Sequence, residues 1–255
     1  MDFKGHVALE QGRCHPLTVL DDHSRYLLGL VACADQTEAT VRAHLTTLFR
    51  RYGRPRALLC DNGSPWGGSD PNAFTELEVW LLRLSVRTYH GRPYHPQTQG
   101  KDERFHRTLA VEVLQGRRIA DLGACQPVFD RFRAVYNTER PHEALAMAVP
   151  RSRYQASPVA FPATLPKPQY HASDLVRRVH HDGAVRLHGR RIKLSQAFRG
   201  MDLAFRPGAT DGVYTVYFMR FPVADADLRD GAVVLARRRR GRLDEAVPPR
   251  PSLTP

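Results

Sequence analysis

Three acidic residues occupy positions from which carboxylates of separate elements could share metal ions. Asp2 falls on the polar face of the first predicted strand, Asp2–Leu9, in which apolar and polar residues alternate. Asp61 is the first polar residue after Ala57–Cys60, an apolar run typical of a covered central strand. Glu103 lies in the first turn of a predicted helix that faces the same sheet edge. Such a trio suits phosphodiester chemistry, in which two metal ions about 3.5–4 Å apart clamp the attacking and leaving oxygens.

The neighbouring acids have simpler interpretations, and so does Glu103 itself. The helix dipole favours a carboxylate in a first turn, so Glu103 also fits a surface residue in a salt-bridged turn. Asp21 and Asp22 fit a turn between two strands. Asp102 is predicted to point about 100° away from Glu103 and into solvent. Glu112 lies more than two helical turns beyond Glu103, too far to share a metal ion with it.

Three motifs around the candidate acids resemble those of the DDE transposases and retroviral integrases. The run M-D-F-K-G-H contains Asp2 and resembles the first motif, and C-D-N-G-S-P-W contains Asp61 and resembles the second. The third is G-x-x-E-R-F-x-x-T-L, which this chain matches in the run from Tyr94 to Leu109. The resemblance implies that Asp2, Asp61 and Glu103 are the catalytic and metal-binding residues.

The spacing of the motifs is most similar to that of insertion-sequence transposases. Between Asp61 and Glu103 lie 41 residues, somewhat more than in integrases, and the extra residues fall in the loop around Trp66–Pro71. The similarity continues through L-D-D-H-S-R-Y at Leu20–Tyr26 and Y-N-T-E-R-P-H-E-A-L at Tyr136–Leu145. The chain begins one residue before Asp2, whereas relatives carry helix-turn-helix segments upstream, so we expect a partial reading frame.

The resemblance implies an enzyme, a DNA transposase with a ribonuclease-H-like core. Such an enzyme uses two Mg²⁺ or Mn²⁺ ions per active site to cleave DNA at transposon ends and to transfer the freed 3′ ends into target DNA. Expected partners are the transposon ends, the target DNA and further copies of the chain, in the bacterial cytoplasm at the nucleoid. Two alternatives are a catalytically silent DNA-binding relic and a nuclease of the same fold without strand transfer.

Several basic and polar residues are candidates for holding DNA. Arg107 lies one helical turn after Glu103, where it can reach a phosphate or form an i,i+4 salt bridge with Glu103. Trp66 can stack on a base or pack on its own protein. The remaining candidates border the acids or lie near the end of the chain: Lys4, His95, Gln97, Lys101, Arg104, Arg237, Arg238, Arg239 and Arg240.

Charge and cysteine content agree with a polyanionic partner inside a reducing compartment. The formal net charge is +12, and from Lys167 onward there are 17 Lys and Arg against 9 Asp and Glu. Such an excess favours nucleic acid as a partner, although an Arg-rich codon usage would also produce it. Cys14, Cys33, Cys60 and Cys125 form no C-x-x-C pair and are expected to be reduced and mostly buried. No apolar run is long enough to span a membrane, so no membrane partner is expected.

The periodicity predicts an α/β catalytic core at residues 1–149, with a mixed five-stranded sheet and flanking helices. The helices are expected after the cap Thr37, over Asn72–Leu84 behind Asp70-Pro71, from the third motif to about Gln115, and over Gln126–Glu139. In the last of these, Val128, Phe132 and Val135 form the expected inner face. The strands that follow the first are expected at His15–Leu20, Tyr26–Ala34, Ala57–Cys60 and Val86–His90.

Composition changes after the core. Repeated prolines predict an extended linker at residues 150–168. Five short β runs between Leu175 and Phe218, separated by turn signals, predict a small β-barrel for DNA binding or assembly at residues 169–222. The basic, proline-rich residues 223–255 are expected to form a disordered tail.

Overall fold

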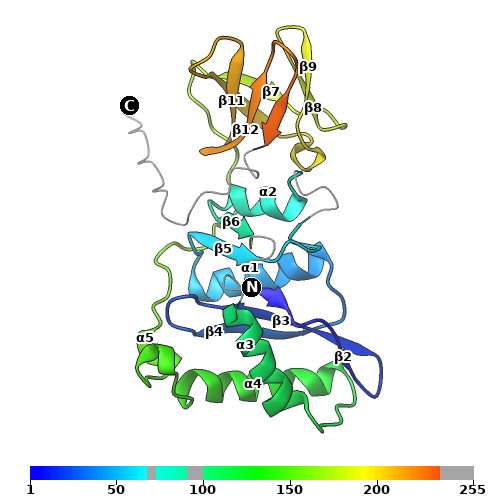
Figure 1. Ribbon diagram of the computed structural model, residues 1–255, viewed down its shortest axis with the longest axis vertical. Coiled ribbons are helices and arrows are strands. Elements are labelled where there is room, and N and C mark those ends of the chain that lie inside the picture. The colour runs from blue at the N-terminus through cyan, green and yellow to red at the C-terminus, as the bar shows by residue number, and fades with distance from the viewer. Residues whose placement is uncertain (68–72, 91–99, 236–255) are drawn as a thin grey trace. The chain divides into compact units, whose positions relative to one another are not determined.

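The structure, a computed structural model, describes residues 1–67, 73–90 and 100–235 (Figure 1). The chain divides into two compact units, Met1–Lys167 and Pro168–Pro255. Among the residues that are described, no helix is long and apolar enough to cross a membrane.

An antiparallel sheet is built around strand β3 of the N-terminal unit. Its strands are β1 (Asp2–Phe3), β2 (Val7–Ala8), β3 (Arg13–Leu20) and β4 (Leu27–Cys33). Both β1 and β2 pair with β3, which also pairs with β4. The single strand predicted over Asp2–Leu9 is broken at Gly5, whose φ of 92° is a conformation that suits glycine.

A parallel pair of strands adds the rest of the central layer. Strand β5 (Ala57–Cys60) pairs with β6 (Arg87–His90). The amino nitrogen of Met1 donates a hydrogen bond to the carbonyl oxygen of Leu59 at 3.0 Å, which brings β1 next to β5. The strands therefore follow the order β4-β3-β1-β5-β6 across the unit (Figure 1). The predicted mixed α/β architecture is confirmed. In place of the predicted single five-stranded sheet, a four-stranded antiparallel sheet and a two-stranded parallel sheet are connected by the hydrogen bond of Met1.

Capping residues set where the first two helices begin. Helix α1 (Glu38–Tyr52) starts behind Thr37, as predicted, and the Thr37 side chain accepts a hydrogen bond from the Thr40 amide. Helix α2 (Glu76–Arg83) starts later than the predicted Asn72. The reason is a capping box, in which Thr75 and Glu78 each accept a hydrogen bond from the other's main chain.

The third-motif helix has the predicted inner face. Helix α3 (Gly100–Leu109) continues as a π-helical turn over Ala110–Leu114. Phe105, Leu109 and Val113 are buried, as their spacing predicted. They form one hydrophobic cluster with residues of β3, β4 and α4 (Leu122–Thr138), whereas α1 and α2 pack in a second cluster with β5.

The inner face of helix α4 is rotated from the predicted one: Val128 and Phe132 are half-buried and pack against the core, but Val135 does not. Val135 is 42% exposed, and the buried face includes Cys125, Phe129 and Tyr136. Asn137 fixes this rotation, because its side-chain amide donates to the carbonyl of Leu27 at 3.0 Å and its oxygen accepts from the Leu27 amide at 2.8 Å. A buried polar group must satisfy its hydrogen bonds, so this contact restricts how α4 can turn.

The proline-rich segment after the core packs on the N-terminal unit. It begins with the short helix α5 (Pro150–Arg153). Beyond α5, the ring of Tyr154 stacks on that of Tyr26 with centroids 4.3 Å apart. The Ser157 amide donates to the Tyr52 carbonyl at 2.9 Å, and the Arg54 amide donates to the Val159 carbonyl at 2.7 Å. All four cysteines are free and buried, as expected.

The C-terminal unit is an open sheet with an added hairpin. Its sheet has the order β13-β12-β11-β10-β7, and among residues 168–235 the partner of β8 is β9 alone. The strands are β7 (Leu175–Arg178), β8 (Ala184–Leu187), β9 (Arg190–Lys193), β10 (Asp202–Pro207), β11 (Val213–Phe218), β12 (Phe221–Asp227) and β13 (Val233–Leu235).

Two expectations for this unit need correction. Within residues 168–235, no ladder closes the sheet, so the predicted barrel is not formed. Strands β12 and β13 also extend the folded unit past Pro222, where a disordered tail was expected to begin. Phe221, Val223 and Ala226 are buried, which explains why this segment joins the sheet.

Candidate active site

Asp2 is a half-buried carboxylate with a perturbed pKa. Strand β1 carries it, and its Oδ1 accepts a hydrogen bond from the Phe3 amide at 2.7 Å. Burial, together with the charges of Asp61 and Asp102, raises the pKa of Asp2 to about 6, against the opposing effects of the Phe3 amide and the terminal ammonium. The charge of Asp61 therefore acts on the carboxyl group of Asp2.

Asp61 follows directly on β5, at the strand end where its position was predicted. Its Oδ1 accepts a hydrogen bond from the Asn62 amide at 2.7 Å. Its main-chain carbonyl oxygen lies 2.9 Å from Nδ1 of His90, at the end of the neighbouring strand β6. The backbone of Asp61 is thus held by β6 while its side chain stays at the edge of the sheet.

In the first turn of α3, the exposure of Asp102 and Glu103 is the reverse of the predicted one. Asp102, predicted to be solvated, has a side chain only 14% exposed, with Oδ2 3.3 Å from the amino nitrogen of Met1. Glu103 is exposed instead. Since Phe105 and Leu109 fix the rotation of α3, and successive residues are about 100° apart, Asp102 turns toward β1. Over the described ranges, no three His, Cys, Asp or Glu side chains form a metal-binding group.

The predicted DNA contacts beside the acids are partly exposed. Arg104 and Arg107 are exposed, and in the part of the chain that the structure describes no ion pair joins Arg107 to Glu103. Lys101 forms an ion pair with the Asp22 carboxylate. Lys4 is half-buried, next to the first strand.

The other predicted contacts separate into those that the structure describes and those that it does not. Trp66 is 2% exposed and packs on Phe3 with ring centroids 5.8 Å apart, so it packs on its own protein. The remaining predicted contacts, His95, Gln97, Arg237, Arg238, Arg239 and Arg240, lie outside the described residues.

Two buried polar side chains, one linked to Asp61 through His90 and one bonded to Asp2, were not predicted as site residues. Glu78 is 1% exposed and lies 2.8 Å from Nε2 of His90 through Oε1. Thr18 is fully buried, and its hydroxyl donates to the carbonyl of Asp2 at 2.9 Å. The pattern T-x-x-E that begins at Thr75 predicts a helix cap. No pattern in the sequence predicts that Glu78 of this cap also contacts His90.

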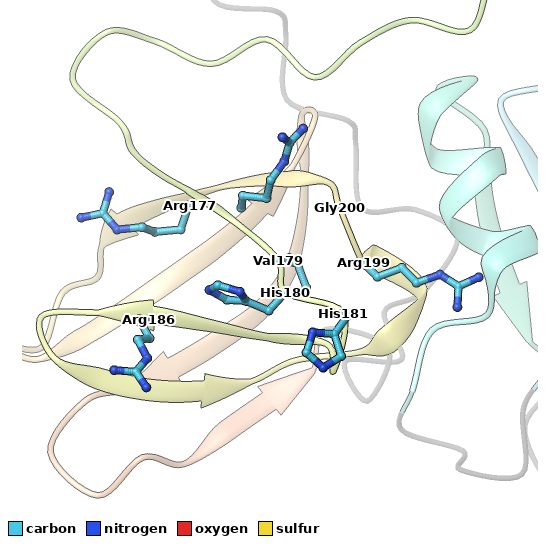
Figure 2. Close-up of a pocket in the computed structure, with 8 residues that line it drawn as sticks. Arg177, Val179, His180, His181, Arg186, Arg199 and Gly200 are labelled. Carbon is cyan, nitrogen blue, oxygen red and sulfur yellow. The ribbon is translucent and has the colours of Figure 1, made fainter.

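A second candidate surface lies in the C-terminal unit. A hollow of about 720 Å³ is floored by the buried Val179. Figure 2 shows the basic side chains arranged around it. Its other lining residues are Arg177, Arg178, His180, His181, Arg186, Arg199 and Gly200.

The basic residues of this hollow are exposed, and two of them contact neighbouring residues of the sheet. Arg178 is 3.3 Å from the Asp202 carboxylate, and Arg177 donates to the Val176 carbonyl. The run R-R-V-H-H at Arg177–His181 is the sequence signal that could have identified this surface.

Family models match most of the chain. Two models, each described as an integrase core domain, match residues 1–96 and 84–150. The model for the C-terminal domain of IS481 family transposases matches residues 174–233. These matches cover both units and include Asp2, Asp61 and Glu103 in the core. The chain belongs to the insertion-sequence DDE transposase and integrase family.

Viral relatives share part of the core sequence. The Pro-Pol polyprotein of feline foamy virus is 31% identical over 124 residues, which are 46% of this chain and 10% of that polyprotein. The Pro-Pol polyprotein of simian foamy virus type 1 is 28% identical over 120 residues, again 46% of this chain and 10% of the relative. The chain thus spans about a tenth of the length of these relatives.

Two solved structures are similar in outline. The simian T-cell lymphotropic virus intasome, in complex with PP2A regulatory subunit B56 gamma, contains a chain with 14% identity and a TM-score of 0.47. That similarity covers 84% of this chain and 73% of the other. The catalytic core domain of BIV integrase has 20% identity and a TM-score of 0.42, over 59% of this chain and 90% of that domain.

Proposed function

We propose that this chain is a metal-dependent DNA transposase that cleaves phosphodiester bonds at transposon ends and transfers the freed 3′ ends into target DNA. The observation that supports this most directly is the pair Asp2 and Asp61, which come from separate strands and repel each other electrostatically. Two close carboxylates are costly without a cation, because each disfavours the ionised form of the other. The pair therefore suits a divalent metal ion.

The donor set fits Mg²⁺ or Mn²⁺. All candidate ligands are carboxylate oxygens, the ligands that hard divalent cations prefer. Asp2 and Asp61 would hold the ions, with Glu103 as the third ligand and two ions per site. When bound, such ions polarise the phosphate and stabilise charge on the attacking and leaving oxygens. The protein itself contributes positioning, so none of its side chains is required as a nucleophile.

DNA would contact both units of the chain. Exposed Arg104 and Arg107 lie on the same helix as Glu103, and with Lys4, Lys101, His95 and Gln97 they would bind phosphates close to the reacting bond. The basic hollow around Arg177 and Arg186, with Arg237–Arg240, would bind further phosphates of the DNA backbone. We also propose that several copies assemble on the DNA, and that the protein acts at the bacterial nucleoid.

An oligonucleotide assay with Mg²⁺ or Mn²⁺ tests this proposal. Duplexes that carry the transposon end should be cut, and their 3′ ends should become joined to a second duplex. Asp61→Asn should abolish both products and leave folding and general DNA affinity intact, because it removes one charge without changing size. Cutting without joining would favour the ribonuclease-H-like nuclease, and DNA binding without cutting would favour the silent relic. Wild-type rates in Asp61→Asn would show that the metal-site assignment is wrong.

A further inference from the structure

Glu78 is a buried carboxylate that joins helix α2 to strand β6. Oε2 accepts the Thr75 amide at 2.8 Å as part of the helix cap. Oε1 lies 2.8 Å from Nε2 of His90 and 3.4 Å from the hydroxyl of Thr88. Burying a carboxylate is costly unless hydrogen bonds satisfy it, and the contact with His90 is a short hydrogen bond of this kind.

The hydrogen bonds of His90 fix where its ring protons lie. A carbonyl oxygen only accepts, so Nδ1 must carry the proton that bridges the 2.9 Å to the carbonyl of Asp61. One further proton must lie between Nε2 and Oε1 of Glu78, whichever of the two atoms holds it. The imidazole therefore links a buried carboxylate to the main chain of Asp61.

A second histidine is linked in a similar way to the main chain of Asp2. The Thr18 hydroxyl donates its only proton to the carbonyl of Asp2 at 2.9 Å. His106 lies 2.9 Å from the same hydroxyl through Nε2 and must therefore donate to it. Burial lowers the pKa of His106 to about 4, which agrees with a neutral ring that carries its proton on Nε2.

We propose that His90 and His106 are positioning residues that hold the two aspartates through their main-chain carbonyls, His90 directly for Asp61 and His106 through Thr18 for Asp2. This inference rests on the proposed function, in which the two carboxylates bind metal. Repulsion between Asp2 and Asp61 would separate the strand ends that carry them, and hydrogen bonds to both backbones oppose that movement. Outer-sphere contacts of this kind typically change metal affinity or activity about 10–100-fold.

Two substitutions of His90 separate positioning from packing. The amide nitrogen of Asn can replace Nδ1, so His90→Asn keeps a donor for the Asp61 carbonyl. The longer Gln can replace Nε2, so His90→Gln keeps a donor for Glu78 and loses the one for Asp61. We expect His90→Gln to bind Mn²⁺ about 10–100-fold more weakly in calorimetry, with His90→Asn within about threefold of wild type. Equal Mn²⁺ affinity for the two variants would overturn the role of His90.

Thr18 provides an independent pair for the second aspartate. Thr18→Ser keeps the hydroxyl that bridges His106 and Asp2, whereas Thr18→Val is similar in volume and has none. Thr18→Val should weaken Mn²⁺ binding about 10–100-fold and lower kcat while leaving KM for DNA unchanged. Thr18→Ser should stay near wild type. A Thr18→Val protein with wild-type Mn²⁺ affinity would overturn the role of His106.

Nitrogen NMR of the wild-type protein tests the geometry without any variant. With ¹⁵N-labelled histidine, His90 should show a protonated Nδ1, and His106 should show a protonated Nε2 and a bare Nδ1. A His90 ring with a bare Nδ1 overturns the proposal even if the variants do not fold. If the wild-type protein has the expected ring protons but binds no Mn²⁺ and cuts no DNA, the proposed function fails, and the positioning role fails with it.

Discussion

The amino nitrogen of Met1 lies 3.0 Å from the carbonyl oxygen of Leu59, and this hydrogen bond makes β1 and β5 neighbours in the central layer. Asp2 follows Met1, and Asp61 lies two residues after Leu59. The two carboxylates therefore reach the same part of the sheet from strands far apart in the sequence. Their proximity raises the pKa of Asp2 beyond the effect of burial. This electrostatic conflict gives the first prediction.

We predict that Asp2→Asn stabilises the metal-free protein at neutral pH. The pKa of Asp2 is about 6 in the folded chain, compared with an ordinary value of 3.8. The folded chain therefore binds this proton more tightly than the unfolded chain does. Stability from this group is therefore present below about pH 4 and is lost as pH rises through 6. With allowance for partial exposure, the gain should be on the order of 1 kcal/mol, or about 2–4 °C in Tm. Thermal melts at pH 4 and pH 7.5 measure it.

Asp35 provides a control of opposite sign. Its carboxylate accepts hydrogen bonds from Thr40 and Thr37, which lower the pKa of Asp35 to about 2. Asp35→Asn should therefore lower Tm at neutral pH, and the difference from wild type should shrink as pH falls through 4 toward 2. If both variants shift Tm in the same direction at pH 7.5, the electrostatic account of Asp2 is incorrect.

The third acid of the site is tested by two adjacent substitutions. We predict that Glu103→Gln abolishes cleavage and that Asp102→Asn retains it to within about tenfold, because Asp102 is committed to the amino group of Met1. Each variant removes one negative charge from the same turn of α3. Single-turnover cleavage with Mn²⁺ compares them, and circular dichroism checks that both fold. The reverse result would assign the third ligand to Asp102, the acid that the structure turns toward Asp2.

The sequence identified positions along the chain better than rotations of helices. Asp2 and Asp61 were predicted from strand patterns, because a strand end fixes which residue comes first at the sheet edge. Asp102 and Glu103 are adjacent on a helix, and about 100° of rotation decides which of them faces inward. Packing of Phe105 and Leu109 decides that rotation, and a single sequence does not reveal it. The same limit applies to His90, whose partners Glu78 and Asp61 come from other elements.

Helix α4 has the same ambiguity. The predicted stripe of Val128, Phe132 and Val135 and the observed stripe of Cys125, Phe129 and Tyr136 both recur at helical spacing. The choice depends on Asn137, whose hydrogen bonds to Leu27 are invisible in the sequence. In the C-terminal unit, small Ala224 and Ala226 weakened the apolar pattern of β12, so its strand was not predicted.

A matched pair of truncations tests which face of α4 is in the core. Phe129 is fully buried and Val135 is 42% exposed. We predict that Phe129→Ala lowers the free energy of unfolding by about 3–5 kcal/mol, because it removes a large side chain and leaves a cavity. Val135→Ala should change it by no more than about 0.5 kcal/mol. Urea denaturation measures both. A larger loss for Val135→Ala would mean that the sequence-based face is the buried one.

The last prediction concerns the basic hollow of the C-terminal unit. Arg177 and Arg186 are exposed at its rim. If each contacts one phosphate, the double variant Arg177→Gln/Arg186→Gln should reduce the slope of log affinity against log salt by about 1.8 on duplex DNA. The loss should be the same for end-containing and scrambled duplexes, because phosphate contacts carry no sequence information. Fluorescence anisotropy from about 50 to 200 mM salt measures the slope.

The control for the hollow is a double variant with the same change in charge elsewhere. Arg151 and Arg153 are exposed on α5 of the N-terminal unit. Arg151→Gln/Arg153→Gln should leave the salt slope almost unchanged, because a charge that contacts no phosphate affects affinity without releasing counterions from the binding site. Equal slopes for the two double variants would show that net charge alone, and not the hollow, accounts for DNA binding by this unit. A loss confined to end-containing duplexes would instead show that Arg177 and Arg186 read bases.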